Sequence, residues 1–257
     1  MKVRSRFSST PKKSSSKQQS ANAAERWTKS RVLEEFKLLA DPKVRAKLAY
    51  FGIDAPKAHG ISAPVLHKFA RHIGKDQQLA EELWDSGIHE ARILAALIGE
   101  PGKVTPAQME RWVKDFDSWD VVDTACCYLY AEAKPAWKKA IEWSRRKKEF
   151  EKRASFALVA YLSYKDKAAP DARVAQFLRV IEREAYDERN FVRKAVNWAL
   201  RNIGKRNTRL NREAIRAAER IRQQGSRAAR WIAADALREL KSEAVQKRLR
   251  RKAALSK

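Results

Sequence analysis

The stretch KRASFALVAYL, residues 152–162, decides the fold of this chain. After a basic pair it continues as an apolar stripe rich in small residues, a pattern typical of a helix that packs closely against other helices. Similar segments recur along the chain, each beginning near an arginine, and the first interval has room for one further unit at 118–129. The segments are EARILAALIG (90–99), KRASFALVAYL (152–162), VRKAVNWALRNI (192–203) and ARWIAADALREL (229–240), with Arg92, Arg153, Arg193 and Arg230 at their starts.

Repeats of roughly 30–40 residues built from helix pairs are the signature of HEAT-type solenoids. Strand-like alternation is nearly absent, and the eight glycines and eight prolines fall mainly between the periodic segments. We therefore predict an all-α superhelical solenoid of HEAT-like repeats, whose small residues let paired helices approach closely. A helical bundle could carry similar segments and is the alternative fold.

The charge of the chain indicates the class of its partner. Lys and Arg number 56 against 31 Asp and Glu, which gives a formal net charge of +25 and a pI near 10.3. Such an excess is the electrostatic footprint of a nucleic-acid binder. A polybasic membrane-surface protein and charge kept for solubility are the competing interpretations. No apolar run approaches the roughly 18 residues of a membrane span, and the N-terminus has no secretory signal.

The domain organisation follows from composition. Residues 1–24 carry seven serines, six basic residues and no acid, so we predict a disordered basic tail there. A mitochondrial presequence is the rival, but the segment lacks an amphipathic apolar stripe. The HEAT-like domain is predicted at 25–252, and 253–257 as a disordered end.

The cysteines and histidines suggest no metal chemistry. Cys126 and Cys127 are adjacent, a spacing that suits neither a disulfide nor a metal clip, and the four histidines show no ligand spacing. We predict no metal site, no cofactor and a reduced cytoplasmic compartment, with association to the nucleoid when the protein is bound to DNA.

The most informative functional stretch is FDSWDVVDTACCYLY, residues 116–130. If it is helical, Trp119 and Asp123 share one face at i and i+4, while the apolar face is formed by Val122, Ala125, Cys126 and Leu129. A carboxylate beside an indole in so basic a chain suggests chemistry on something anionic. Each residue has an ordinary alternative, a surface carboxylate or an arginine partner for Asp123 and a packing residue for Trp119.

A second helix carries an unusual tryptophan. On a helical wheel of residues 191–207, Trp198 falls opposite the apolar face, among Lys194, Arg201 and Lys205. Seven basic residues and no acid lie between positions 189 and 209. An aromatic side chain in a basic field is typical of a nucleic-acid contact surface, although a neighbouring helix could instead cover the ring. Arg153 has two interpretations of equal weight: a bidentate phosphate clamp or an inter-repeat arginine.

These segments resemble the HEAT-like-repeat DNA alkylation repair proteins, the AlkD-type alkylpurine DNA glycosylases. The resemblance covers most of the chain after residue 40. Its motifs are GISAP and the following helix (60–73), ELWDS with EARILAAL (82–97), SWDVVD (118–123), KRASFALVAYL (152–162) and KAVNWALRNIGKRN (194–207).

The resemblance implies roles for five residues. Asp123 would be the catalytic carboxylate, Trp119 and Trp198 the aromatic residues of the cleft, and Arg153 the phosphate-gripping arginine. Tyr50 would be a further cleft tyrosine, in an uncertain register. The helical wheel adds three predicted DNA contacts: Lys194, Arg201 and Lys205.

The implied activity is a metal-independent DNA glycosylase that removes cationic N3- or N7-alkylated purines from duplex DNA, acting as a monomer in base excision repair. Some members of the superfamily have lost this activity and bind unusual DNA structures, so a non-catalytic protein that binds damaged or branched DNA is the alternative. A HEAT scaffold that binds an acidic peptide is a third class. The basic tail and the basic C-terminal end, 246–257, are not part of the resemblance.

Overall fold

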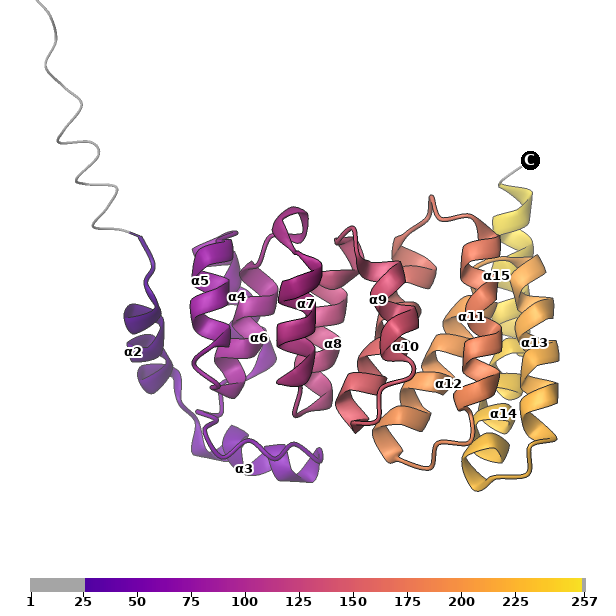
Figure 1. Cartoon of the computed structure of the whole chain (residues 1–257), viewed down its shortest axis with the longest axis horizontal. Helices are drawn as coiled ribbons and strands as arrows, with labels where there is room; N and C mark the ends of the chain where they lie inside the picture. Colours follow the sequence, from indigo (N-terminus) through magenta and orange to yellow (C-terminus); the bar gives the residue numbers. More distant parts are fainter. Residues whose placement is uncertain (1–25, 256–257) are drawn as a thin grey trace, which may run out of the picture.

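A computed structural model describes residues 26–255, which form fourteen α-helices, two short 3-10 helices and no strand (Figure 1). The all-helical solenoid predicted from the repeats is confirmed. None of the described helices is long and apolar enough to cross a membrane. The helices are α2 (Lys29–Leu39), α3 (Pro42–Tyr50), α4 (Ala63–Ile73), α5 (Gln77–Trp84), α6 (His89–Ile98), α7 (Pro106–Lys114), α8 (Trp119–Tyr128), α9 (Ala136–Trp143), α10 (Glu149–Lys165), α11 (Asp171–Glu184), α12 (Asn190–Gly204), α13 (Thr208–Arg222), α14 (Arg227–Leu240) and α15 (Glu243–Ala254); the 3-10 helices are η1 (Pro101–Lys103) and η2 (Tyr130–Glu132).

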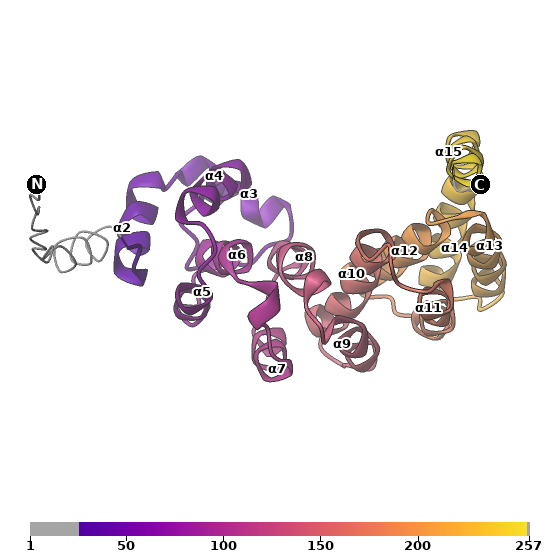
Figure 2. The ribbon, with the colours of Figure 1, turned by 90° about the horizontal axis from the view of Figure 1, so that it is seen from above.

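The helices form two rows that run side by side along the solenoid (Figure 2). One row, which we call the outer row, contains α5, α7, α9, α11 and α13. The inner row contains α6, α8, α10, α12 and α14, and consecutive members of this row pack against one another. Alanines at positions such as Ala157, Ala195 and Ala233 are fully buried there, so the small residues of the repeats allow the close approach that the sequence predicted.

Arginines at the starts of the inner helices join consecutive repeats. In three of the four similar segments, the arginine side chain contacts the following inner helix or the residues just before it. One arginine binds a carboxylate, one binds a backbone carbonyl, and one lies over an aromatic ring. The fourth, Arg230, bonds instead to the backbone of the preceding turn. The three pairs are Arg92 with Asp117, Arg153 with Phe191 and Arg193 with Trp231.

Tryptophans fill the core under the outer row. Trp84 and Trp112 stack with ring centroids 3.9 Å apart and an interplanar angle of 5°, and both are buried. Trp84 Nε1 donates to Asp115 Oδ2 at 2.9 Å, so the ring and its polar atom are both satisfied within the core. Trp84 is thus a structural residue of the core.

The two ends of the described chain depart from the regular repeat. At the N-terminal end α3 contributes no buried residue and lies crosswise below the solenoid in the view of Figure 1. At the other end α15 packs on α13 and α14 and continues through Ala253 and Ala254, two residues beyond the domain end predicted at 252. The tail predicted at residues 1–24 lies outside the described residues.

Candidate functional site

The first turn of α8 positions the residues that the sequence singled out. Trp119, Asp123 and Cys127 follow one another at intervals of four residues and are half-buried, so they share a face. The opposite face is fully buried in the core, as the wheel predicted. That buried face consists of Val122, Ala125, Cys126 and Leu129.

Asp123 forms a two-pronged ion pair with Arg153 of α10. Arg153 Nε donates to Oδ1 at 3.1 Å and Nη2 donates to Oδ2 at 2.8 Å, while Nη1 donates to the carbonyl oxygen of Phe191 on α12 at 2.8 Å. The Arg153 side chain is only 7% exposed and that of Asp123 is 18% exposed. Arg153 therefore has the inter-repeat position that the sequence left open, and it orients the carboxylate; its phosphate contact stays a prediction.

Two opposing effects act on the pKa of Asp123. Burial raises it, the charge and hydrogen bonds of Arg153 lower it, and the balance lies above the usual aspartate value. Each carboxylate oxygen has a lone pair beyond the one that Arg153 uses. Asp123 can therefore still accept a hydrogen bond from water or face a developing positive charge.

The neighbouring Asp120 belongs to a different contact. Its Oδ2 lies 3.0 Å from Nε2 of His89 on α6. Burial disfavours the charged imidazole of His89, but its hydrogen bond to Asp120 and the charges of Asp120, Glu90 and Asp117 together outweigh this and raise the pKa of His89. Asp120 and Asp123 are three residues apart on one helix, yet they bond to opposite neighbours in the inner row.

The end of α3 lies against the same face. Trp119 Nε1 donates to the carbonyl oxygen of Phe51 at 3.0 Å. The next residue, Gly52, has a φ of +71°, and a side-chain carbon there would lie 3.0 Å from Cζ of Phe191, so this turn reaches from α8 to α12. Tyr50 stands just before it and is 87% exposed. The loop thus brings Phe51, the neighbour of Tyr50, to Trp119, while a role of Tyr50 in the site stays a prediction.

The structure corrects the placement of Trp198 opposite the core, while its contact with DNA stays a prediction. The ring is half-buried against the core cluster and meets the ring of Tyr161 on α10 edge-to-face, with centroids 4.9 Å apart. The wheel placed Trp198 opposite the core because it treated α12 alone. In a solenoid each inner helix also packs sideways against its neighbours in the row, and α10 covers this flank.

Two of the three cations predicted around Trp198 are neutralised. Arg201 and Lys205 both pair with Glu239 of α14, and Arg201 also lies 3.6 Å from Asp235. Their basic field is therefore compensated by carboxylates some 30 residues away in the sequence, which a local charge count does not include. Lys194 is exposed, so its predicted contact with DNA remains open.

Tyr161 is a site residue that the sequence interpretation missed. It lies two turns after Arg153 on α10, so the two share a face, and it contacts Trp198. Burial raises the pKa of its hydroxyl, and the nearby carboxylate of Asp123 raises it further. The i+8 spacing from Arg153 was a usable signal, but the tyrosine was interpreted as part of the apolar stripe.

The described residues contain no cluster of three or more His, Cys, Asp or Glu side chains that could hold a metal ion. Cys126 and Cys127 are both free thiols, and Cys126 is buried. Burial raises the pKa of both thiols, which disfavours the reactive thiolate. The cysteines therefore act in the structure as packing residues at the edge of the site.

Two solved structures are similar to this chain to different degrees. A solved structure described as "A new family of proteins related to the HEAT-like repeat DNA glycosylases with affinity for branched DNA structures" is similar with a TM-score of 0.70 and 19% identity, covering 87% of this chain and 96% of that one. A designed armadillo repeat protein in complex with the peptide (KR)4 has a TM-score of 0.37 and 12% identity, covering 75% of this chain and 82% of its own. No curated protein matches.

The first of these similarities, at 19% identity, supports the HEAT-like fold alone. The model of one protein family, described as DNA alkylation repair enzyme, matches residues 32–240. That range contains the Asp123–Arg153 pair and the aromatic residues around it. The chain therefore belongs to the DNA alkylation repair enzyme family.

Proposed function

We propose that the protein is a DNA glycosylase that hydrolyses the N-glycosidic bond of cationic N3- or N7-alkylated purines in duplex DNA. The observation that carries this proposal is the carboxylate of Asp123, which Arg153 orients and which Trp119 flanks one turn earlier on α8. Membership of the DNA alkylation repair enzyme family supports the reaction class, and the net charge of +25 supports a DNA substrate.

Hydrolysis of this bond needs little chemical assistance from the protein. When the C1′–N bond of an alkylated purine breaks, its electron pair neutralises the positive charge of the base, so the base leaves without a general acid. The sugar becomes an oxocarbenium ion, which a nearby carboxylate stabilises. Water then adds to C1′ and gives up a proton. Asp123 has the lone pairs to orient this water while both its oxygens remain bonded to Arg153.

The aromatic residues suit a cationic base. The faces of Trp119 and Trp198 carry negative electrostatic potential and attract positive charge. Trp119 is held by its bond to Phe51, and Trp198 by its contact with Tyr161. Both rings are therefore held in place before a nucleotide arrives, which lowers the entropic cost of binding.

The test is release of free base from duplex DNA that contains 7-methylguanine or 3-methyladenine. Asp123→Asn should slow single-turnover release by about 100-fold or more, with DNA affinity retained. Asp120→Asn is the matched control, because it makes the same chemical change one turn away in a residue that pairs with His89. Base release by the Asp123→Asn variant at the wild-type rate would contradict the catalytic role.

A non-catalytic DNA-binding function is the second candidate. It is favoured by the Asp123–Arg153 pair itself, which explains the carboxylate as an inter-repeat contact, and by the similar protein whose family has affinity for branched DNA. This candidate predicts tight, salt-sensitive binding to a four-way junction, weaker binding by Trp198→Ala, and no base release from any alkylated duplex. Release that depends on Asp123 would exclude it.

A further inference from the structure

Helix α15 lies beyond the matched range of the family model, which ends at residue 240. It is attached to the solenoid by Leu249, which is 1% exposed, and by Gln246, whose amide donates to Asn211 Oδ1 at 3.0 Å and to the carbonyl oxygen of Leu240 at 2.7 Å. Anchored in this way, α15 forms one wall of a pocket of about 1100 Å³. The ends of α10 and α12 and the start of α13 form the others.

The pocket is lined by five basic side chains and one carboxylate. The carboxylate, Asp171, is already used, because it accepts from Arg206 and Asn207 and pairs with Arg209. The lining therefore keeps a surplus of positive charge. Its basic residues are Lys167, Lys205, Arg206, Arg248 and Lys252.

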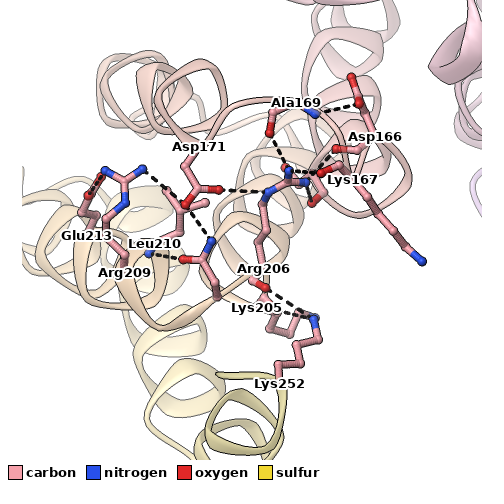
Figure 3. A network of polar contacts seen from close by, with 12 residues as sticks. Asp166, Lys167, Ala169, Asp171, Lys205, Arg206, Arg209, Leu210, Glu213 and Lys252 are labelled. Atoms are coloured by element: carbon pink, nitrogen blue, oxygen red, sulfur yellow. Dashed lines mark hydrogen bonds and ion pairs between the residues drawn. The ribbon is translucent and has the colours of Figure 1, made fainter. Parts of the chain in front are cut away.

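Three of the five cations, Lys252 among them, have structural tasks. Arg206 donates to four carbonyl oxygens, one in the last turn of α10 and three in the α10–α11 connection, at 2.7–3.1 Å, and Figure 3 shows its guanidinium directed into that loop. Lys205 pairs with Glu239 at 2.6 Å. Lys167 and Arg248, by contrast, are exposed. These two side chains supply charge that a ligand can reach.

Lys252 shows how closely the charges gather. Its ammonium donates to the carbonyl oxygens of Lys205 and Arg206 at the end of α12 (Figure 3). Burial lowers its pKa, and the charges of Arg248, Arg206 and Lys167 lower it further. A bound anion would relieve this repulsion. The positive end of the α13 dipole adds to the same field, because Thr208, the first residue of that helix, also lines the pocket.

Two tyrosines of α10 connect the pocket with the candidate site. Tyr164 lines the pocket and is 49% exposed. Its ring centroid lies 6.0 Å from that of Tyr161, which in turn contacts Trp198. Tyr164 and Tyr161 therefore form a short row of aromatic rings on α10 between the basic pocket and the candidate site. Aromatic rings beside basic side chains suit a nucleic-acid strand, whose bases stack and whose phosphates are charged.

We propose that this pocket binds the sugar-phosphate backbone of the DNA that flanks the base in the candidate site. Lys167 and Arg248 would contact successive phosphates, and Tyr164 would pack against a sugar or base between them. The identity of the flanked base rests on the proposed function, but the backbone contact does not require catalysis. Arg248 of α15 would therefore be a DNA contact outside the family-matched segment, whereas Lys167 and Tyr164 lie within it.

The test compares two double variants that remove the same charge. Lys167→Gln with Arg248→Gln removes the two reachable cations and spares Lys252, which holds α15 to α12. Arg250→Gln with Arg251→Gln is the matched control, since both residues are exposed on α15 and neither lines the pocket. Circular dichroism and thermal unfolding first confirm that both variants fold; should the pocket variant not fold, Arg248→Gln and Arg250→Gln alone provide the same comparison.

The readout is affinity for an undamaged duplex as a function of salt. Losing two phosphate contacts should make the slope of log K against log salt shallower by about 1.8 and weaken binding by about tenfold at low salt, with the control within about twofold of wild type. Equal losses in both variants would overturn the proposal. If wild type releases no alkylated base while the affinity difference persists, the backbone site stands and the glycosylase proposal falls.

Discussion

Arg153→Met tests whether one side chain both joins the repeats and orients Asp123. The substitution removes three bonds, two to the Asp123 carboxylate and one to the carbonyl oxygen of Phe191. It leaves a carboxylate that is 18% exposed without a partner in an inner-row position. Methionine preserves most of the volume, so the loss should come from electrostatics and hydrogen bonding, with little contribution from a cavity.

The expected loss can be calculated from these contacts. Removing one partner of a buried ion pair costs about 3–5 kcal/mol. Because Asp123 is partly exposed, we expect a cost near the lower end of this range. The lost bond to Phe191 adds about 1 kcal/mol. We therefore expect the free energy of unfolding at pH 7 to fall by about 4 kcal/mol. Asp123→Leu with Arg153→Met should recover at least about 2 kcal/mol of this, because it removes the unpaired charge.

The pH dependence has a definite sign. Without Arg153, burial raises the folded-state pKa of Asp123 further above its unfolded value, so the folded protein binds the proton more readily than the unfolded chain does. The stability lost at pH 7 should therefore return as the pH falls through the folded pKa. Urea unfolding at several pH values measures this, with Asp123→Asn plus Arg153→Met as the non-titrating control. A loss below about 1 kcal/mol, or identical pH profiles in both variants, would refute the reasoning.

Two further predictions concern the scaffold. Burial raises the pKa of Glu110, but bonds from Trp143 and Lys139 and the charge of Arg146 bring it to about 2; Glu110 therefore contributes stability that is present above its unfolded pKa and lost as the pH falls from about 4.5 toward 2. Glu110→Gln should lower the free energy of unfolding at pH 7 by up to about 3 kcal/mol and should remove this loss of stability at acid pH, as measured by urea unfolding. An unchanged loss at acid pH would contradict the assignment. Gly60 has a φ of +82°, and a side-chain carbon there would lie 2.3 Å from the carbonyl oxygen of Asp41, so Gly60→Ala should cost more than about 2 kcal/mol in thermal unfolding. The control is Gly87→Ala, which has a φ of +66° and open space around it; equal losses would show that backbone strain alone, without crowding, explains the effect.

Much of the fold followed from the periodicity of the sequence. The recurring arginines were informative because each begins an inner helix, and Arg92, Arg153 and Arg193 contact the following repeat. The face of α8 could also be predicted, since a single wheel separates Asp123 from the core. These successes concern contacts within one helix or a position repeated in every unit.

The errors concern relations between helices. Trp198 was placed opposite the core because a wheel has one buried side, whereas an inner helix of a solenoid is covered on both flanks. The ion pairs of Arg201 and Lys205 were not predicted because Glu239, their partner, lies 34 residues or more further along the chain, and the contacts of both cations with DNA stay predictions. Tyr50 could be placed only once the turn at Gly52 showed how α3 reaches α12. None of these contacts has a local pattern in the sequence.

The candidate site differs from the rest of the inner row in what surrounds its ion pair. Polar contacts between consecutive inner helices recur, for example His89 with Asp120 and Asn197 with Asp235, so the Asp123–Arg153 pair alone is no mark of an active site. Its distinguishing neighbours are Trp119, four residues before the carboxylate, and Tyr161, eight residues after the arginine. Aromatic faces on both helices can hold a cationic base beside the carboxylate. The His89–Asp120 and Asn197–Asp235 pairs also have an aromatic residue four positions before the carboxylate, but neither has one eight positions after its partner. Under the proposed function, the reaction centre therefore depends on the combination of Trp119 and Tyr161 as much as on the ion pair.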